Sequence, residues 1–96
     1  MAIQGFASSR VEDFFRTGRV PKRAGGGSVG RVVLRKLDVL DYAQELRDLA
    51  SPPGNRLEAL RGDLAGLHSI RVNDQWRIVF RWQASNAYDV QVVDYH

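Results

Sequence analysis

Trp76-Arg77-Ile78-Val79-Phe80-Arg81-Trp82 alternates large apolar side chains with a second set that contains two arginines. Successive side chains of a β-strand point to opposite faces, so the two tryptophans, Ile78 and Phe80 share one face. Apolar residues at every second position mark a buried strand face. We therefore interpret the tryptophans as core packing rather than as base-stacking groups, and we place the two arginines on the open face of an antiparallel sheet.

Two further strands are predicted beside this one, at Leu67 to Val72 and at Tyr88 to Tyr95, with a shorter strand near Leu57 to Leu60. Matching the apolar faces sets their register, because a slip of one residue would turn every side chain to the other face. The first hairpin then closes through a three-residue loop, Asn73-Asp74-Gln75. The predicted cross-strand pairs are Val72 with Trp76, Tyr88 with Trp82, and Val90 with Phe80.

This register decides which residues face the arginines. Arg71 lies opposite Arg77, and like charges directly opposite are destabilising. Arg81 lies opposite Asp89 and is compensated, so we interpret it as structural. Arg77 lies opposite Val93 and has no acidic partner in this register, which predicts that it binds an anion.

The N-terminal half is predicted to supply two helices. Ser9 and Glu12 have the spacing of a capping box, so the first helix begins at Ser9. It ends near Thr17, where Gly18 is a typical stop. The second helix is predicted from Arg31 to Leu40, because apolar residues recur there at helical spacing.

The remaining segments complete the predicted architecture. Met1 to Phe6 is compatible with a short edge strand, Asp41 to Leu49 with a further helical turn, and Ser51-Pro52-Pro53-Gly54-Asn55 with a firm break. Helices followed by an antiparallel meander predict an α+β fold in which two N-terminal helices pack on a small twisted sheet. The length predicts a single domain covering residues 1–96.

Positive charge is concentrated in the first half of the chain, and arginine outnumbers lysine 12 to 2. Between Phe14 and Leu37 there are seven positive residues and no negative ones. Arginine binds phosphate through planar two-point contacts, so this segment predicts binding to nucleic acid, with a solvated helix face as the alternative. The predicted RNA-binding residues are Arg16, Arg19, Lys22, Arg23, Arg31, Arg35 and Lys36.

Composition excludes several other classes of site. There are no cysteines, and no stretch approaches the length of a membrane span, which fits a cytoplasmic protein. The glycine-rich run from Ala24 to Gly30 lacks the lysine and the preceding strand of a phosphate-binding loop. His68 and His96 share no ligand spacing, so neither a metal nor a cofactor is predicted.

The C-terminal triplet Asp94-Tyr95-His96 places an acid, a phenol and an imidazole at the end of the last strand. Together with Arg77 they form a set of groups suited to metal-free cleavage of a phosphodiester. RNA supplies its own nucleophile, the 2′-hydroxyl, so such an enzyme needs a base, an acid and a cation for the developing charge. The alternative for Arg77 is a structural contact with solvent or Asp94. The strand alternation leaves open whether Asp94 and His96 join Arg77, since they have the opposite parity from Tyr95.

Several motifs resemble those of the HigB-type toxins of the RelE/ParE superfamily. They are Gly62-Asp63, the run from Gly66 to Asn73, Trp76-Arg77-Ile78 and the final Asp94-Tyr95-His96. Leu46-Arg47-Asp48-Leu49 and the run from Ser51 to Glu58 are most similar to the GraT branch. The resemblance covers essentially the whole chain, and it implies the RelE/ParE-like version of the α+β fold described above.

The resemblance also implies a function. Such a chain is the toxin of a bacterial type II toxin–antitoxin system, an endoribonuclease that cuts mRNA in the ribosomal A site. Its partners are the ribosome, mRNA and a cognate helix-turn-helix, HigA-like antitoxin. The antitoxin forms a hetero-oligomer with the toxin and carries the complex to operator DNA.

The family's active-site positions carry over to Arg61, Arg77, Asp94, Tyr95 and His96. Both arginines are expected to hold the scissile phosphate, and Arg61 stands where many relatives have lysine. Asp94 or His96 is expected to take the 2′-hydroxyl proton, and Tyr95 to orient or stack a base.

Glu58 departs from the family pattern, because some relatives have a histidine of the active site at this position. Two other functions remain open at this point. ParE relatives share the fold and poison DNA gyrase without cutting RNA, and an inactive module could serve only to bind its antitoxin. An acid–base group at the end of a strand favours the nuclease, because a pure binder does not require one.

Overall fold

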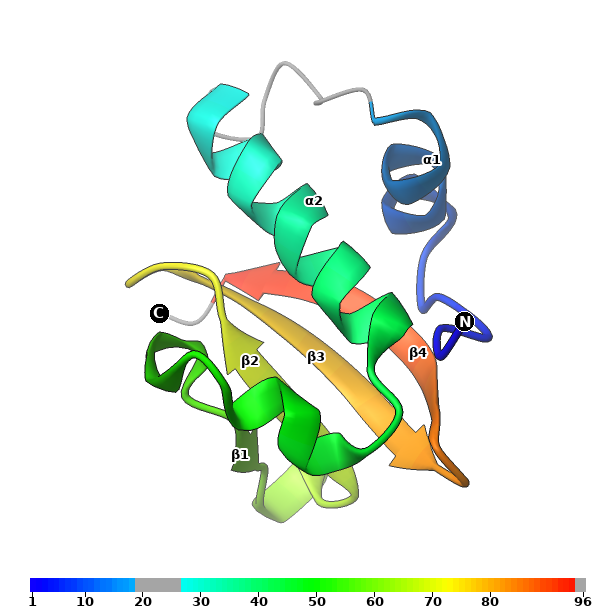
Figure 1. Cartoon of the computed structure of the whole chain (residues 1–96), viewed down its shortest axis with the longest axis vertical. Coiled ribbons are helices and arrows are strands. Elements are labelled where there is room, and N and C mark those ends of the chain that lie inside the picture. The colour runs from blue at the N-terminus through cyan, green and yellow to red at the C-terminus, as the bar shows by residue number, and fades with distance from the viewer. Residues whose placement is uncertain (19–26, 95–96) are drawn as a thin grey trace.

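The computed structural model describes residues 1–18 and 27–94, and these form two helices packed on one face of a four-stranded antiparallel sheet (Figure 1). The sheet has the strand order β1-β2-β3-β4, which is also the order of the chain. Its bounds are Glu58–Ala59 for β1, Leu67–Arg71 for β2, Trp76–Gln83 for β3 and Asn86–Asp94 for β4. The helices are α1 at Ser9–Thr17 and α2 at Gly27–Tyr42, so the predicted α+β arrangement is confirmed.

The core lies between the helices and the sheet, as the alternation in β3 predicts. Ile78 and Phe80 are fully buried, and both tryptophans of β3 pack against the same cluster. The helices contribute residues at helical spacing, among them Leu37 and Leu40, which are also fully buried. The interpretation of the tryptophans as packing residues is confirmed.

The first hairpin has the predicted register. Arg71 is the cross-strand partner of Arg77, and the Val72 N–H donates to the Trp76 carbonyl oxygen at 2.9 Å. The lower half of the second hairpin is also as predicted, with Arg77 opposite Val93. A slip of one residue in either hairpin would turn the arginines of β3 towards the core, which disfavours it.

The upper half of the second hairpin differs from the prediction by one residue. Arg81, rather than Trp82, lies opposite Tyr88, and Phe80 falls in the interruption of the ladder between Val79 and Arg81. The cause is Asp89, whose φ of 54° makes an irregularity in β4 that adds a residue to this strand. Tyr88 therefore joins the open face, where its ring centroid lies 5.2 Å from the Arg81 guanidinium carbon.

The start of α1 also differs from the prediction. Ser8, not Ser9, caps the helix, and its side chain accepts a hydrogen bond from the Val11 N–H at 3.3 Å. Glu12 forms an ion pair with Arg16 at 2.9 Å rather than closing a capping box. The predicted stop is confirmed, because Gly18 adopts a φ of 70° that favours glycine and its N–H donates to the carbonyl of Phe14.

Helix α2 begins at Gly27, four residues before the predicted start at Arg31, and ends at Tyr42, two residues beyond the predicted Leu40. Val29 explains the earlier start, since it continues the buried stripe of the helix and packs against the core. Glycines beside it weaken the helical signal in the sequence without preventing the helix.

The N-terminal segment runs parallel to β4 through two isolated bridges, Ile3 with Ala87 and Phe6 with Val90. It therefore covers the edge of β4 without forming the continuous edge strand that the sequence suggested. Its backbone is also fixed to the end of α2, because the Ala2 N–H donates to the Asp41 carbonyl at 2.7 Å.

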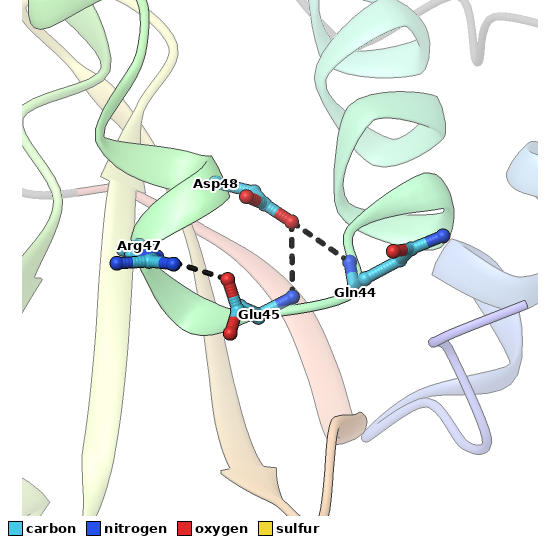
Figure 2. Close-up of polar contacts among 4 residues, drawn as sticks. All are labelled: Gln44, Glu45, Arg47 and Asp48. Carbon is cyan, nitrogen blue, oxygen red and sulfur yellow. Dashed lines mark hydrogen bonds and ion pairs between the residues drawn. The ribbon is translucent and has the colours of Figure 1, made fainter.

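A short 3₁₀ helix, η1 at Leu46–Ala50, follows α2 as a separate element rather than as a continuation of that helix. One carboxylate oxygen of Asp48 accepts the backbone N–H groups of Gln44 at 3.0 Å and Glu45 at 2.9 Å (Figure 2). These two bonds, that from Glu45 first, favour the charged carboxylate and lower the pKa of Asp48. The same turn carries an ion pair between Glu45 and Arg47 at 2.9 Å.

The break at residues 51–55 is fixed to α2 by one side chain. Asn55, in the 3₁₀ turn η2 at Pro53–Asn55, is 0% exposed, and its amide donates to the carbonyls of Leu49 and Ser51, each at 3.2 Å. Its carbonyl oxygen accepts a hydrogen bond from the Lys36 ammonium. Strand β1 begins three residues later, at Glu58, so these contacts hold the segment that leads into the edge of the sheet.

Candidate active site

Arg77 lies on the face of the sheet that is turned away from the helices, and it contacts two residues of neighbouring strands. Its Nη1 donates to the hydroxyl of Ser69 at 3.2 Å and lies 3.4 Å from a carboxylate oxygen of Glu58. The register explains this grouping, because Glu58 is paired with Ser69 and all three side chains project to the same face. The prediction that Arg77 has no acidic partner is wrong, since the partner comes from β1.

Burial separates the members of this group. Ser69 is fully buried, and the side chain of Arg77 is 13% exposed, whereas that of Glu58 is 47% exposed. A guanidinium held by a buried hydroxyl has little freedom to leave its position. The group therefore presents a fixed cation beside a carboxylate that solvent or a ligand can reach.

Arg61 lies three residues after Glu58, at the start of the 3₁₀ turn η3 at Gly62–Leu64. It is exposed, and together with Glu58, Ala59 and Leu60 it lines an open groove along β1. Strand β1 is the edge strand of the described sheet (Figure 1). Glu58 therefore contacts Arg77 directly and lines the same groove as Arg61.

Asp94 lies on the other face of the sheet. It pairs with Trp76, whose side chain packs on the core, so the Asp94 side chain projects towards the helix side of the sheet. This is the direction predicted for a straight strand. Its carboxylate accepts a hydrogen bond from the side-chain amide of Gln75 at 3.1 Å. The other two members of the predicted triplet, Tyr95 and His96, lie outside the described residues.

The predicted basic residues fall into distinct environments. Arg31 and Arg35 are exposed one turn apart on α2, and Arg16 is exposed in its ion pair with Glu12. Lys36 is partly buried through its bond to Asn55, and its pKa is lowered by this burial and by the nearby charges of Arg35 and Arg71. Three further predicted residues, Arg19, Lys22 and Arg23, lie outside the described residues.

Two residues of the site carry no clear signal in the sequence. Ser69 is a small polar residue on the face opposite the core, and only the register identifies it as a partner of Arg77. Gln75 belongs to a predicted loop, and its contact with Asp94 joins segments 19 residues apart. Arg81 is paired across the strands with Tyr88 rather than with Asp89, which corrects the predicted register, but the predicted ion pair is confirmed because its guanidinium lies 3.2 Å from the Asp89 carboxylate.

Within residues 1–18 and 27–94, no group of three or more histidine or acidic side chains is placed to hold a metal ion. The same part of the chain contains no helix of the length and apolar character needed to cross a membrane.

Two helices on one face of a short antiparallel sheet are also the arrangement found in solved structures of YoeB-type toxins. The YoeB–YefM complex from Staphylococcus aureus contains a chain with this fold, with a TM-score of 0.59 at 16% identity over 98% of this chain and 94% of that one. At this identity the likeness establishes the fold alone.

Sequence comparison identifies the family. Residues 4–96 match the HigB-like toxins, described as the RelE-like toxin of type II toxin–antitoxin system HigB. The chain belongs to this family of toxins, as its motifs predict. It is 43% identical to Toxin HigB-1 of Vibrio cholerae over 85% of this chain and 84% of that protein. It is 36% identical to Endoribonuclease HigB of Proteus vulgaris over 64% and 65% of the two chains.

Proposed function

We propose that this toxin cleaves mRNA in the ribosomal A site by metal-free attack of the RNA 2′-hydroxyl. Its place in the HigB family makes it an endoribonuclease toxin of a type II system with an antitoxin partner. Beyond this, we propose that the cleavage depends on the ribosome, takes place in its A site and needs no metal ion. The observation that carries it is the fixed Arg77 guanidinium beside Glu58, a residue that also lines a groove with Arg61.

Arg77 is suited to stabilise the charge that develops on the scissile phosphate. Donors that are already in place act most strongly on a transition state, because they need no reorganisation during the reaction. The contact with buried Ser69 provides this preorganisation. Arg61 is exposed on the adjacent groove and provides a second, mobile cation for the same phosphate.

In the reaction the 2′-oxygen bonds to phosphorus, the bond from phosphorus to the 5′-oxygen breaks, and the 2′-hydroxyl proton passes to a base. We assign this proton to Glu58, because its carboxylate lies beside Arg77 on the same face, whereas Asp94 lies on the opposite face. The departing 5′-oxygen takes a proton from the C-terminal group, where Tyr95 and His96 remain the proposed residues. Products are a 2′,3′-cyclic phosphate and a 5′-hydroxyl end.

The basic residues Arg16, Arg31 and Arg35 are proposed to contact the backbone of ribosomal RNA, together with Arg19, Lys22 and Arg23. Binding should therefore weaken as salt rises. Lys36 contributes to this surface through its charge, while its ammonium holds Asn55. The proposed antitoxin is a helix-turn-helix protein of the HigA type that binds operator DNA in a hetero-oligomer with the toxin, in the cytoplasm.

The test is primer extension on a defined mRNA in a reconstituted translation system, with and without ribosomes. We expect cuts at codon positions with ribosomes present, and their loss in Arg77→Ala. The matched control is Arg81→Ala, which removes an arginine from the same strand and face and should leave cleavage intact. If folded wild-type protein leaves mRNA uncut, the function must be sought in gyrase inhibition or antitoxin binding alone.

A further inference from the structure

Arg71 and Arg77 form a like-charge pair on the open sheet face, in the last β2–β3 pair before the hairpin loop. They are direct cross-strand partners on β2 and β3. In antiparallel strands such partners lie about 4.5–5.5 Å apart at their Cα atoms, so two positive side chains leave the sheet side by side. This arrangement is destabilising in the protein alone and favourable beside an anion.

The two arginines are compensated to different degrees. Arg77 is held by buried Ser69 and by Glu58. Arg71 forms an ion pair with Asp74, a residue three positions away in the hairpin loop whose side chain is 97% exposed. The Arg71 side chain is itself 28% exposed, so only the carboxylate of this pair lies fully in water. Water can solvate the released Asp74, so a phosphate can replace it at Arg71.

Arg71 also lies within electrostatic reach of a cation of α2. The pKa of Lys36 is lowered by burial first and then by the charges of Arg35 and Arg71. Lys36 therefore adds to the positive charge that an anion meets at Arg71.

We propose that Arg71 binds the phosphate adjacent to the one held by Arg77, so that the pair takes two successive phosphodiesters of the RNA substrate. The inference rests on the proposed nuclease function and extends it to the path of the RNA strand. Arginine suits this role because its planar fork binds two phosphate oxygens at once. Arg71 in this role contacts substrate without stabilising the reacting phosphate, so it affects binding rather than the chemical step.

The experiment measures toxin binding and single-turnover cleavage on ribosomes programmed with two mRNAs. One mRNA is fully ribose, and the other carries a 2′-deoxy nucleotide at the cleavage site and cannot be cut. Arg71→Ala should weaken binding about tenfold, the range of one charged hydrogen bond, with the maximal cleavage rate retained. It should also reduce the slope of log affinity against log salt by about one.

Two matched variants control for general effects of charge and folding. Arg81→Ala removes the same charge from the same sheet face but should not alter binding, since Arg81 is compensated by Asp89 and Tyr88. Asp74→Asn leaves Arg71 in place and removes its exposed partner, so it should strengthen binding.

A neutral methylphosphonate on either side of the scissile phosphate locates the contact. At one of these two positions the methylphosphonate should weaken the binding of wild-type toxin. The same methylphosphonate should not weaken the binding of the Arg71→Ala variant any further, because the contact is already lost. The proposal is overturned if the effects of the methylphosphonate and of Arg71→Ala on binding are additive at both positions. It is also overturned if Arg71→Ala binds as tightly as Arg81→Ala, or if Arg71→Ala binds normally but cleaves more slowly. Failure of wild type to cut the ribose mRNA refutes the nuclease function instead, and binding to the uncleavable mRNA still decides the role of Arg71.

Discussion

Asn55→Ala should destabilise the protein by about 3 kcal/mol. Asn55 is 0% exposed and makes three side-chain hydrogen bonds, two to the carbonyls of Leu49 and Ser51 and one from Lys36. Each such bond contributes on the order of 1 kcal/mol, and alanine replaces none of them. For a domain of this size the loss corresponds to a fall in melting temperature of roughly 15 °C.

The assay is chemical and thermal unfolding of the isolated toxin, with Asn73→Ala as the matched control. Asn73 also accepts two backbone hydrogen bonds, from the N–H groups of Gln75 and Trp76, each at 2.8 Å. It lies in a half-exposed hairpin loop, where water can replace the side chain, so its loss should cost about 1 kcal/mol or less. Equal destabilisation by both substitutions would refute the argument that burial makes Asn55 the stronger tie.

Three other predictions concern local contacts. Gly18→Ala should destabilise the protein by about 1 kcal/mol in urea unfolding, because its φ of 70° strains a side chain, while a Cβ there would meet only Leu34 Cδ2 at an ordinary contact distance of 3.8 Å. Asp48→Asn should lower stability at pH 7, and the difference from wild type should shrink as pH falls below the ordinary carboxyl pKa of about 4. The folded pKa of Asp48 is lowered, so its contribution is complete above the ordinary value and is lost as pH falls through the folded value; a difference that does not shrink in acid would contradict this. Ser69→Ala should reduce the maximal cleavage rate with little change in ribosome binding, and Ser69→Thr should partly restore it, because Ser69 positions Arg77; equal losses in both variants would indicate a packing role.

The alternation in β3 is enough to predict the core face, the first hairpin and the arginine pair. A three-residue loop and two apolar faces admit one register, and the structure has it. The second hairpin departs from this logic at Asp89, which adopts a left-handed conformation. A pattern with a period of two residues contains no information about such a local backbone choice, so the one-residue shift and the contact of Tyr88 with Arg81 could not be predicted.

The site was predicted less completely than the fold. Glu58 lies 19 residues from Arg77 in sequence, and it reaches that residue through a strand only two residues long. The predicted shorter strand near Leu57 to Leu60 is confirmed by β1, but two residues carry no periodicity from which its register with β2, and hence the contact of Glu58 with Arg77, could be predicted. Lys36 shows the opposite problem, because it belongs to a run of positive charge in the sequence while its ammonium contacts a buried amide. Charge along a chain does not reveal which cations remain available to a ligand.

Three arginines share the open sheet face, and the different ways in which they are compensated assign them different roles. Arg81 has a carboxylate and an aromatic ring, which is the pattern of a structural residue. Arg71 has an exposed carboxylate that an incoming phosphate can displace, which is the pattern of a residue that contributes to binding. Arg77 is held from below by a buried hydroxyl, and this immobility is of use chiefly to a transition state. Removal of these side chains should therefore affect three different quantities: stability for Arg81, substrate affinity for Arg71 and cleavage rate for Arg77. If this face served only to bind a protein partner, loss of any of the three arginines would be measured as a loss of binding affinity. Separate effects on stability, substrate affinity and cleavage rate are therefore expected of an enzyme and not of a pure binding surface.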